Sequence, residues 1–277
     1  MTQSRILITG SNAGFGRLAV LKMASEGHHV IATMRNLAKG DALLADCKAS
    51  GVEIEVRQLD VCDPASVDSA LSDAAGIDVL INNAGFEVQG AVEMIDDELM
   101  RRQLDTNVMG PLRTIRAVMP SWRKRGSGVI VNLSSVAGIV ASPYGGAYTA
   151  SKFALEGMSE ALHYEVAPAG IRVHLIEPGR FSSTDFSNNI IHPEGWEGSE
   201  HQQRQQSFRE ALGSIDSDGP QDSQLVADAI ARAASDPTTP FRTLVGDDAL
   251  KIAGARAATK SFEDFEAAIR ATINWHS

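Results

Sequence analysis

Residues 5–16 read RILITGSNAGFG, in which a short apolar run passes directly into a glycine-rich turn. The run RILIT has the length and composition of a buried strand, and helical spacing begins at residue 15. Gly10, Gly14 and Gly16 stand in the spacing GxxxGxG. Glycines at such positions let the chain turn tightly, let the backbone approach a pyrophosphate, and let the next helix pack close to the sheet. Since a helix N-terminus adds N–H donors and partial positive charge, the turn is predicted to bind an anion.

The alternation of strand and helix continues along the chain. Apolar runs of strand length recur at 5–9, 29–33, 53–59, 77–82, 128–134, 171–177 and 241–245. Several are nearly continuous in Val, Ile and Leu, which is typical of strands buried on both faces of a parallel sheet. Stretches with helical spacing lie between them, at 15–26, 64–75, 96–123, 147–168 and 221–235. This order predicts right-handed βαβ units and an α/β, Rossmann-type doubly wound sheet of about seven parallel strands with helices on both faces.

Composition sets limits on domain organisation and partners. With 277 residues, 43% of them hydrophobic, the chain can bury one large core, so we expect a single domain over residues 1–277. A net charge of −10 without clusters of Lys and Arg argues against nucleic acid or an anionic membrane as a partner. Two cysteines supply neither a disulfide framework nor a metal-ligand cluster, and no metal is expected. The N-terminus shows no secretory or transit signal and no apolar window approaches the ~20 residues that span a bilayer, which favours a cytoplasmic protein.

Two regions depart from this alternation. Residues 182–220 are polar, poor in β-branched residues and without a clear period, and they follow a strand at the carboxyl edge of the sheet. We interpret them as an irregular substrate loop or lid. The tail 246–277 is predicted to form a packing helix. Its apolar residues at helical spacing are Phe262, Phe265, Ile269 and Ile273.

The end of the second strand bears on the choice of cofactor. Dinucleotide sites that prefer NAD usually place a carboxylate ~20 residues after the glycine turn, where it binds the ribose 2′-hydroxyl. Here that neighbourhood reads ATMRN, with Met34 and Arg35 and no carboxylate. A carboxylate would repel a 2′-phosphate, whereas an arginine binds it through charge-assisted hydrogen bonds. The sequence therefore predicts NADP(H) in preference to NAD(H), with the Ser11 hydroxyl as a second contact to the phosphate.

A tyrosine and a lysine share one helix face in YGGAYTASKFALEG, residues 144–157. Tyr148 and Lys152 stand at i and i+4, so both side chains point at one spot. Hydride transfer to a ketone leaves negative charge on the oxygen, which a proton donor must quench. A lysine ammonium and an oxidised nicotinamide both lower the pKa of a nearby phenol, which suits Tyr148 as the acid or base. Ser135 ends a strand 13 residues before Tyr148 and could hydrogen-bond the substrate oxygen.

The order of these motifs resembles the short-chain dehydrogenase/reductase family, over nearly the whole chain to about residue 186. TGSNAGFG at 9–16 matches the family's TGxxxGxG, NNAG at 82–85 matches the motif after its fourth strand, and YTASK at 148–152 matches its YxxxK. DTNVMG carries Asn107 at the position of the family's helix-kinking asparagine. The resemblance implies a catalytic tetrad of Asn107, Ser135, Tyr148 and Lys152.

The same resemblance implies a set of cofactor contacts. Asp60 is expected at the adenine, Lys152 at the ribose, and the EPG turn at 177–179 beside the nicotinamide. Relatives often read PGxFxTDF where this chain reads PGRFSSTDF, with one extra residue, so that either Ser183 or Thr184 contacts the nicotinamide amide. The residues expected to bind the cofactor are Gly10, Ser11, Asn12, Gly14, Phe15, Gly16, Arg35, Asp60, Val61, Asn83, Ala84, Gly85, Tyr148, Lys152, Pro178, Gly179, Ser183 and Thr184.

Three functions compete for this arrangement. The first is an NADP(H)-dependent oxidoreductase acting on a moderately hydrophobic ketone or secondary alcohol, since the motifs look most similar to NADP-linked hydroxysteroid and retinol-type dehydrogenases. The second is a catalytically idle NADP-binding sensor or scaffold, which has no need of Tyr148 beside Lys152. The third is an epimerase or dehydratase of the longer relatives, whose glycine turn is spaced differently and whose C-terminal part is larger. The resemblance also implies a homodimer or homotetramer through helices near 96–123 and 147–168.

Overall fold

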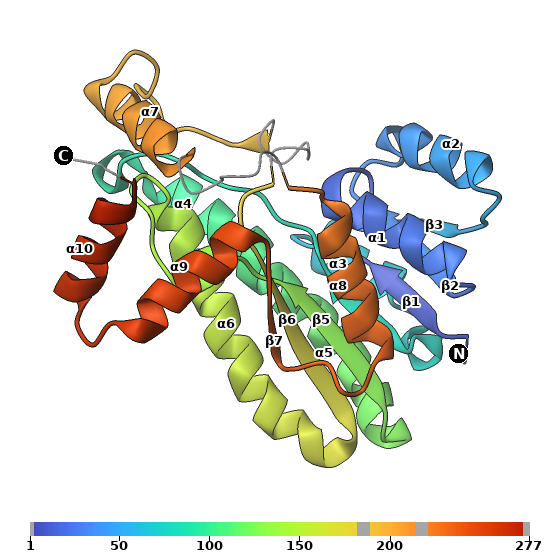
Figure 1. Ribbon diagram of the computed structural model, residues 1–277. Helices are drawn as coiled ribbons and strands as arrows, with labels where there is room; N and C mark the ends of the chain where they lie inside the picture. The colour runs from blue at the N-terminus through green and yellow to red at the C-terminus, as the bar shows by residue number, and fades with distance from the viewer. Residues whose placement is uncertain (1–2, 182–188, 214–220, 274–277) are drawn as a thin grey trace.

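The computed structural model describes residues 3–181, 189–213 and 221–273 (Figure 1). Its centre is a seven-stranded sheet in which neighbouring strands pair in parallel. The strands are β1 (Arg5–Ile8), β2 (His29–Met34), β3 (Glu55–Gln58), β4 (Val79–Asn82), β5 (Gly128–Leu133), β6 (Ile171–Pro178) and β7 (Arg242–Val245). These bounds fall within or close to the predicted apolar runs, so the predicted parallel sheet is confirmed.

The strand order β3-β2-β1-β4-β5-β6-β7 reverses once. The chain starts at β1, moves outward to β3, returns to the other side of β1 at β4, and then proceeds to β7. In open α/β sheets, ligands bind outside the carboxyl ends of the strands at such a reversal. The reversal here lies between β1 and β4, which are followed by the glycine-rich turn and by the NNAG motif.

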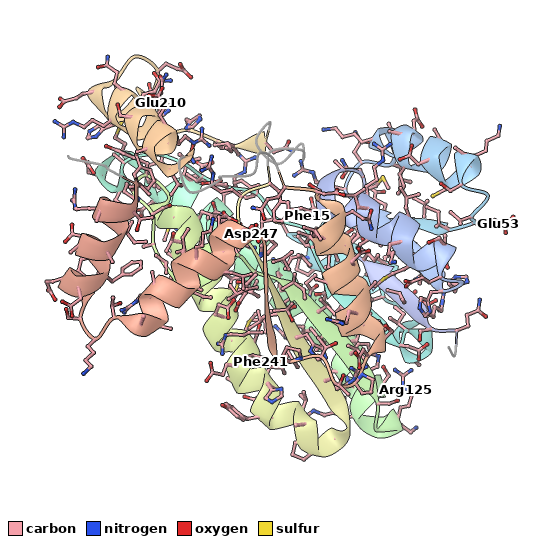
Figure 2. All side chains as sticks on the ribbon, in the orientation of Figure 1. Phe15, Glu53, Arg125, Glu210, Phe241 and Asp247 are labelled. Atoms are coloured by element: carbon pink, nitrogen blue, oxygen red, sulfur yellow. The ribbon has the colours of Figure 1, made fainter. Side chains whose placement is uncertain are left out.

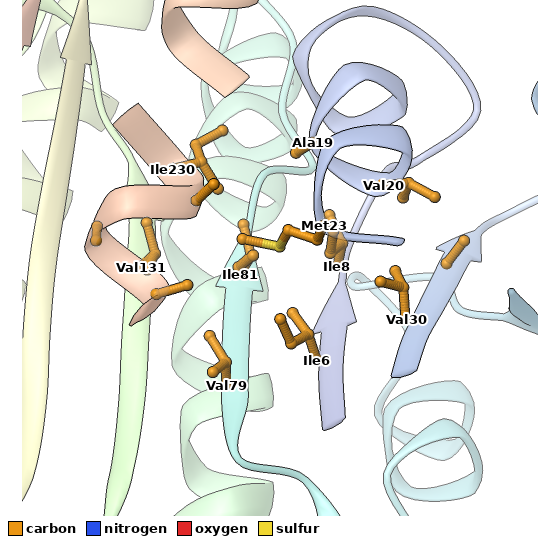
Figure 3. Close-up of a cluster of buried hydrophobic side chains, with 14 of the residues drawn as sticks. Ile6, Ile8, Ala19, Val20, Met23, Val30, Val79, Ile81, Val131 and Ile230 are labelled. Atoms are coloured by element: carbon orange, nitrogen blue, oxygen red, sulfur yellow. The ribbon is translucent and has the colours of Figure 1, made fainter. Parts of the chain in front are cut away.

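Helices cover both faces of the sheet (Figure 1). They are α1 (Gly14–Ser25), α2 (Asp41–Ala49), α3 (Pro64–Ala70), α4 (Asp97–Leu104), α5 (Gly110–Arg125), α6 (Gly146–Val166), α7 (Glu200–Leu212), α8 (Gln224–Ser235), α9 (Asp247–Ala258) and α10 (Phe262–Ile273). Side chains alternate between the two faces along each strand. On β1, Ile6 and Ile8 pack with Met23 of α1 and Ile230 of α8, as Figure 3 shows, whereas Leu7 belongs to the core under α3 and α5.

The stretch predicted as one helix over 96–123 is interrupted. Helix α4 ends at Leu104, a π-helical turn follows at Asp105–Met109, and α5 begins at Gly110. The extra residue in a π-helical turn rotates the side chains that follow it, and such turns occur frequently at functional sites. Asn107, the residue expected to kink this helix, lies in the middle of the turn.

Two expectations about the second half of the chain are wrong. Residues 182–220 are not irregular throughout, because Glu200–Leu212 form α7. Only Gln205 and Phe208 of this helix are buried, which explains why the sequence shows no clear apolar period. The tail forms two helices, α9 and α10, in place of one, and Phe262 at the start of α10 is 63% exposed rather than packed.

Helix α6 brings polar side chains into the interior. Its buried residues include Lys152, Glu156 and Ser159, which lie on the face toward the sheet. Across the described residues, no helix is both apolar and long enough to cross a bilayer.

Candidate cofactor cleft and active site

The carboxyl ends of the strands open into a cleft of about 1680 Å³. Ligand pockets usually measure ~300–1,000 Å³, so the cleft has room for a dinucleotide and a second molecule. The predicted site residues that line it are Gly10, Asn12, Gly14, Phe15, Arg35, Asp60, Val61, Asn83, Ala84, Gly85, Ser135, Tyr148, Lys152, Pro178 and Gly179. Three predicted site residues do not line the cleft but lie behind its wall, namely Ser11, Gly16 and Asn107. Two more, Ser183 and Thr184, lie outside the described residues.

The glycine-rich turn is held against the NNAG segment. Gly10 has a φ of +68°, and a Cβ there would lie 2.9 Å from the Ala84 Cα, so the position requires glycine. The Asn83 side-chain Nδ2 donates to the carbonyl oxygens of Thr9 and Gly10 at 2.9 Å each. A Cβ at Gly16 would collide with this amide, which explains the need for a third glycine. The contacts fix the turn at the N-terminus of α1, where an anion can bind.

Ser11 is placed differently from the expectation. It is fully buried, and its hydroxyl donates to the Ile8 carbonyl oxygen at 2.9 Å. The hydroxyl oxygen of Ser11 in turn accepts from the Thr33 backbone N–H at 3.3 Å. The Ser11 side chain therefore ties the turn to β2 and does not face the cleft, so it cannot supply the predicted second contact to a 2′-phosphate.

Cationic side chains lie where the cofactor's adenosine end was predicted. Arg35 is exposed and lines the cleft, whereas Met34 is buried beneath it. Lys39 lines the same part of the cleft, and the Asn36 side chain accepts from the Ala38 N–H at 3.0 Å to fix the turn between the two cations. Sequence reasoning missed Lys39, although its position four residues after Arg35 was a usable signal.

Asp60 and Val61 follow β3 at the same end of the cleft. The Asp60 carboxylate accepts from the Cys62 N–H at 3.0 Å, and the backbone N–H of Asp60 donates to the Ser66 hydroxyl at 2.9 Å. These bonds fix the turn and leave Asp60 lining the cleft. The adenine contact that the resemblance implies for Asp60 stays a prediction.

Lys152 and Tyr148 meet inside the cleft. The Lys152 ammonium donates to the Leu133 carbonyl oxygen at 2.6 Å and lies 5.4 Å from the centre of the Tyr148 ring. Burial lowers the pKa of Lys152 to about 8, against the opposing effect of the Glu156 carboxylate. Burial also raises the pKa of Tyr148, as does the negative charge of Glu87, whereas a hydrogen bond with Ser135 lowers it. Without a bound cofactor, Tyr148 is therefore a neutral phenol, the form that can donate a proton.

Ser135 connects the tyrosine to the strand ends. Its hydroxyl oxygen accepts from the Ala137 N–H at 3.1 Å and lies 3.3 Å from the Pro178 carbonyl oxygen. Because the same hydroxyl also bonds Tyr148, it sits where a substrate carbonyl oxygen would approach the phenol.

Asn107 acts from behind the wall. It is 1% exposed, and its side chain accepts from the Phe86 N–H at 3.2 Å and donates to the Phe86 carbonyl oxygen at 3.0 Å. It also donates to the Ser151 hydroxyl at 3.1 Å. In this structure Asn107 is a positioning residue that joins the loop after β4 to α6.

Two groups of residues at the far end of the cleft were missed by sequence reasoning. Glu87 and Gln89, from the loop after β4, and Gln205 of α7 supply polar side chains. Phe208 and Leu212 of α7 face Ile269 of α10, and these three supply an apolar wall. Little in the sequence signals either group, because the segments are far apart along the chain and meet only in the folded protein.

The residues and their geometry match one family of enzymes. Residues 4–195 fit the family model described as short chain dehydrogenase. The chain belongs to the short-chain dehydrogenase family. The predicted family resemblance is therefore confirmed, and with it the nicotinamide-dependent oxidoreductase class.

Individual relatives of this short-chain dehydrogenase extend the comparison. It is 38% identical over 249 residues to the 3-ketodihydrosphingosine reductase of Bacteroides thetaiotaomicron, covering 87% of each chain. It is 39% identical over 191 residues to human retinol dehydrogenase 8, covering 67% of this chain and 61% of that one. Among solved structures, a single-residue variant of the actinorhodin polyketide ketoreductase with NADPH superimposes with a TM-score of 0.74 at 25% identity, over 87% of this chain and 95% of that one.

Proposed function

We propose that this short-chain dehydrogenase transfers a hydride between NADP(H) and a moderately hydrophobic ketone or secondary alcohol. The observation that carries the proposal is the convergence of Tyr148, Lys152 and Ser135 in the cleft that begins at the glycine-rich turn. A binding protein without catalytic activity would have no need to bury a lysine beside a tyrosine, because burial of the ammonium is unfavourable.

The chain's own residues have separable tasks in such a reaction. NADP(H), when bound, supplies or accepts the hydride. Tyr148 donates its proton to the carbonyl oxygen in reduction and removes a proton from the alcohol in oxidation. Ser135 hydrogen-bonds the same oxygen, and the Lys152 ammonium stabilises the phenolate that Tyr148 becomes. By family resemblance Lys152 also binds the cofactor ribose.

The preference for NADP(H) rests on charge. Arg35 and Lys39 line the part of the cleft that follows β2, and a 2′-phosphate there would meet two cations. Arg35 and Asn36 line the cleft between the end of β2 and Lys39, and neither carries a carboxylate that would repel the 2′-phosphate. The similar ketoreductase with NADPH supports the same choice.

Substrate class, oligomeric state and location belong to the same proposal. The apolar wall favours a substrate with a hydrophobic part, and the names of the two relatives describe a keto reductase and an alcohol dehydrogenase. A homodimer or homotetramer would bury apolar residues that α6 exposes, among them Phe153 and Tyr164. The free cysteines Cys47 and Cys62 are compatible with a reducing compartment and support a cytoplasmic location.

Assay of nicotinamide oxidation with a panel of simple, steroid and retinoid carbonyls tests this function. We expect NADPH consumption with at least one member, and a loss of about a hundredfold or more in kcat for Tyr148→Phe, which removes the proton donor. Calorimetric titration should give an NADPH Kd for this variant within about twofold of wild type, because little volume changes.

Tyr164→Phe is the matched control, since Tyr164 lies on the same helix and is 68% exposed. It should keep its full rate. If Tyr148→Phe retains more than a few per cent of kcat, the assigned proton donor is wrong.

A further inference from the structure

The far end of the cleft contains polar atoms that the catalytic tetrad does not use. The Gln89 side chain is 8% exposed and that of Gln205 is 5% exposed, and both line the cleft. Among the described residues, the Gln89 Oε1 and Gln205 Nε2 atoms have no hydrogen-bond partner. A buried polar atom without a partner is unfavourable unless a ligand satisfies it. The unpaired atoms are one acceptor and one donor, so they fit a ligand that carries both kinds of group.

Glu87 stands beside this acceptor. The Gln89 Nε2 atom donates to the Glu87 carboxylate at 3.1 Å, which fixes the orientation of the amide and leaves its oxygen unpaired. Ile191 exchanges backbone hydrogen bonds of 2.9 Å with Glu87 and Gln89 on either side of Val88. Since side chains alternate along extended backbone, Glu87 and Gln89 point to the same side, into the cleft, and Val88 to the other.

Hydrogen bonds also fix the backbone of the residues on both sides of Glu87. The Val88 N–H donates to the Gln103 side chain at 2.6 Å, and Phe86 is bonded twice to Asn107. A carboxylate carried on a segment fixed at three consecutive residues is preorganised for binding, because little conformational freedom remains to be lost.

The charge around Glu87 indicates which ligand suits it. Burial raises the pKa of Glu87, and the positive charge of Arg209 on α7 opposes this rise. The Glu87 charge in turn raises the pKa of Tyr148. A cation bound between Glu87 and Tyr148 would stabilise the Glu87 carboxylate. It would also offset the repulsion between this carboxylate and the Tyr148 phenolate that forms during reduction.

We propose that Glu87 determines substrate specificity by binding a protonated amine close to the reacting carbonyl of a ketone substrate. Gln89 Oε1 is the second acceptor for the ammonium, and Gln205 Nε2 donates to an oxygen of the same molecule. The apolar wall of Phe208, Leu212 and Ile269 contacts the rest of the substrate. This inference rests on the proposed function. In the reduction, the carbonyl carbon takes the hydride, its oxygen takes the Tyr148 proton, and the amine keeps its own.

The proposal can be tested with three ketones that share one alkyl chain. They differ in the group on the carbon next to the carbonyl, which is an ammonium, a hydroxyl or a methyl group. Wild type should prefer the amine over the methyl ketone by about tenfold or more in kcat/KM, because only the amine forms a hydrogen-bonded ion pair with the carboxylate. Glu87→Gln keeps the shape and removes the charge, so this ratio should fall to about one.

Glu53→Gln is the control. Glu53 is exposed and does not line the cleft, and Figure 2 labels it at the opposite end of the molecule from Glu210, which belongs to α7. Its amine-to-methyl ratio should equal that of wild type. A wild type that reduces the amine and methyl ketones equally, or a ratio that survives Glu87→Gln, would overturn the proposal.

A binding measurement separates this inference from the proposed function. Calorimetric titration of the amino ketone into Tyr148→Phe, and into the same variant with Glu87→Gln, requires no turnover. The Kd should rise about tenfold or more when the carboxylate is removed. If none of the three ketones is reduced but this rise is seen, the proposed reaction is wrong and the amine site stands. An unchanged Kd rejects the amine site whichever ketones are reduced.

Discussion

Lys152 shows how one side chain can support two tasks. Its ammonium is held by the Leu133 carbonyl oxygen at 2.6 Å and remains over the Tyr148 ring. Burial lowers its pKa to about 8, against the opposing effect of the Glu156 carboxylate one turn away, which favours the charged form. The residue is thus placed to stabilise the Tyr148 phenolate while its remaining N–H groups are available to a ribose.

Arg35 is the residue on which the predicted preference for NADP(H) mainly depends. Replacing it by Ala removes a charge-assisted contact with a 2′-phosphate, so the Kd for NADPH should rise roughly ten- to a hundredfold. The effect should lie toward the lower end because Lys39 remains. The Kd for NADH should hardly change. Steady-state kcat/KM and Kd for both cofactors, in wild type and variant, measure the preference.

Lys48→Ala is the matched control for this change. Lys48 is an exposed cation on α2 that does not line the cleft, and its loss should leave the NADPH Kd unchanged. Added salt should weaken NADPH binding more than NADH binding, because only NADPH depends on a partly exposed ion pair. A wild type that already prefers NADH would show that the stretch ATMRN does not bind phosphate.

At the scale of elements, β6, β7 and α6 are joined behind the active site by two buried carboxyls and an exposed arginine. Arg242 of β7 lies 3.0 Å from the Glu156 carboxylate and 3.4 Å from that of Glu177. Glu177 is 1% exposed and immediately precedes Pro178 of the cleft. Burial, together with the Glu156 charge, raises the pKa of Glu177 to about 8, against the opposing effect of Arg242. Glu177 therefore retains its proton at neutral pH.

This retained proton makes stability depend on pH. Between its ordinary pKa of 4.5 and about 8, Glu177 holds a proton in the folded protein that the unfolded chain releases. The corresponding stability is fully present below the lower value and is lost as pH rises through the upper one. Glu177→Gln imitates the protonated carboxyl, so the Tm of the variant relative to wild type should increase from about pH 5 to about pH 9.

Differential scanning calorimetry across this range measures the effect. Glu160→Gln serves as control, since Glu160 binds the same Arg242 at 2.7 Å but is 45% exposed. Its difference in Tm from wild type should not increase with pH. A Tm difference for Glu177→Gln that is constant or falls as pH rises would contradict the proton retained on Glu177.

At the scale of the whole molecule, the two ends of the cleft are built differently. The cofactor end comes from turns after β1 to β4, and each follows directly from a strand. The far end, where we propose that substrate binds, is assembled from the loop after β4, α7, α9 and α10, which are widely separated in sequence. Helices α7, α9 and α10 pack through a small apolar cluster of their own around Phe208 and Ile273. Substrate choice can therefore change through these helices without altering the sheet.

The predicted homodimer or homotetramer can be tested through an exposed apolar residue of α6. Phe153 of α6 is 46% exposed although large and apolar, and burying such residues between copies would favour association. Light scattering should give two or four times the mass of one chain, and Phe153→Glu should shift the mass toward one chain. Leu44→Glu on α2, where Leu44 is also 46% exposed, should not. A single-chain mass for wild type would reject the oligomer.

The parallel sheet and the motifs around the glycine-rich turn could be recognised before the fold was known. Strands buried on both faces leave continuous Val, Ile and Leu runs, and the glycine turn and the Tyr148 to Lys152 spacing are local patterns. Such features depend on neighbours within a few residues, so they can be recognised before the fold is known. Ser11 is a position where the local pattern was not enough, because its hydroxyl also accepts from the Thr33 backbone N–H of β2, 22 residues further along the chain.

The far end of the cleft could be recognised only in the folded protein. Helix α7 exposes most of its residues and buries only Gln205 and Phe208, so its sequence carries too weak a period to predict a helix. Glu87 resembles an ordinary polar loop residue until the backbone bonds of Ile191 fix its segment and place Glu87 at the cleft. The proton retained on Glu177 likewise depends on burial and on the nearby charges of Glu156 and Arg242. Burial, pairing and electrostatic effects of this kind arise between residues distant in sequence, and no local pattern encodes them.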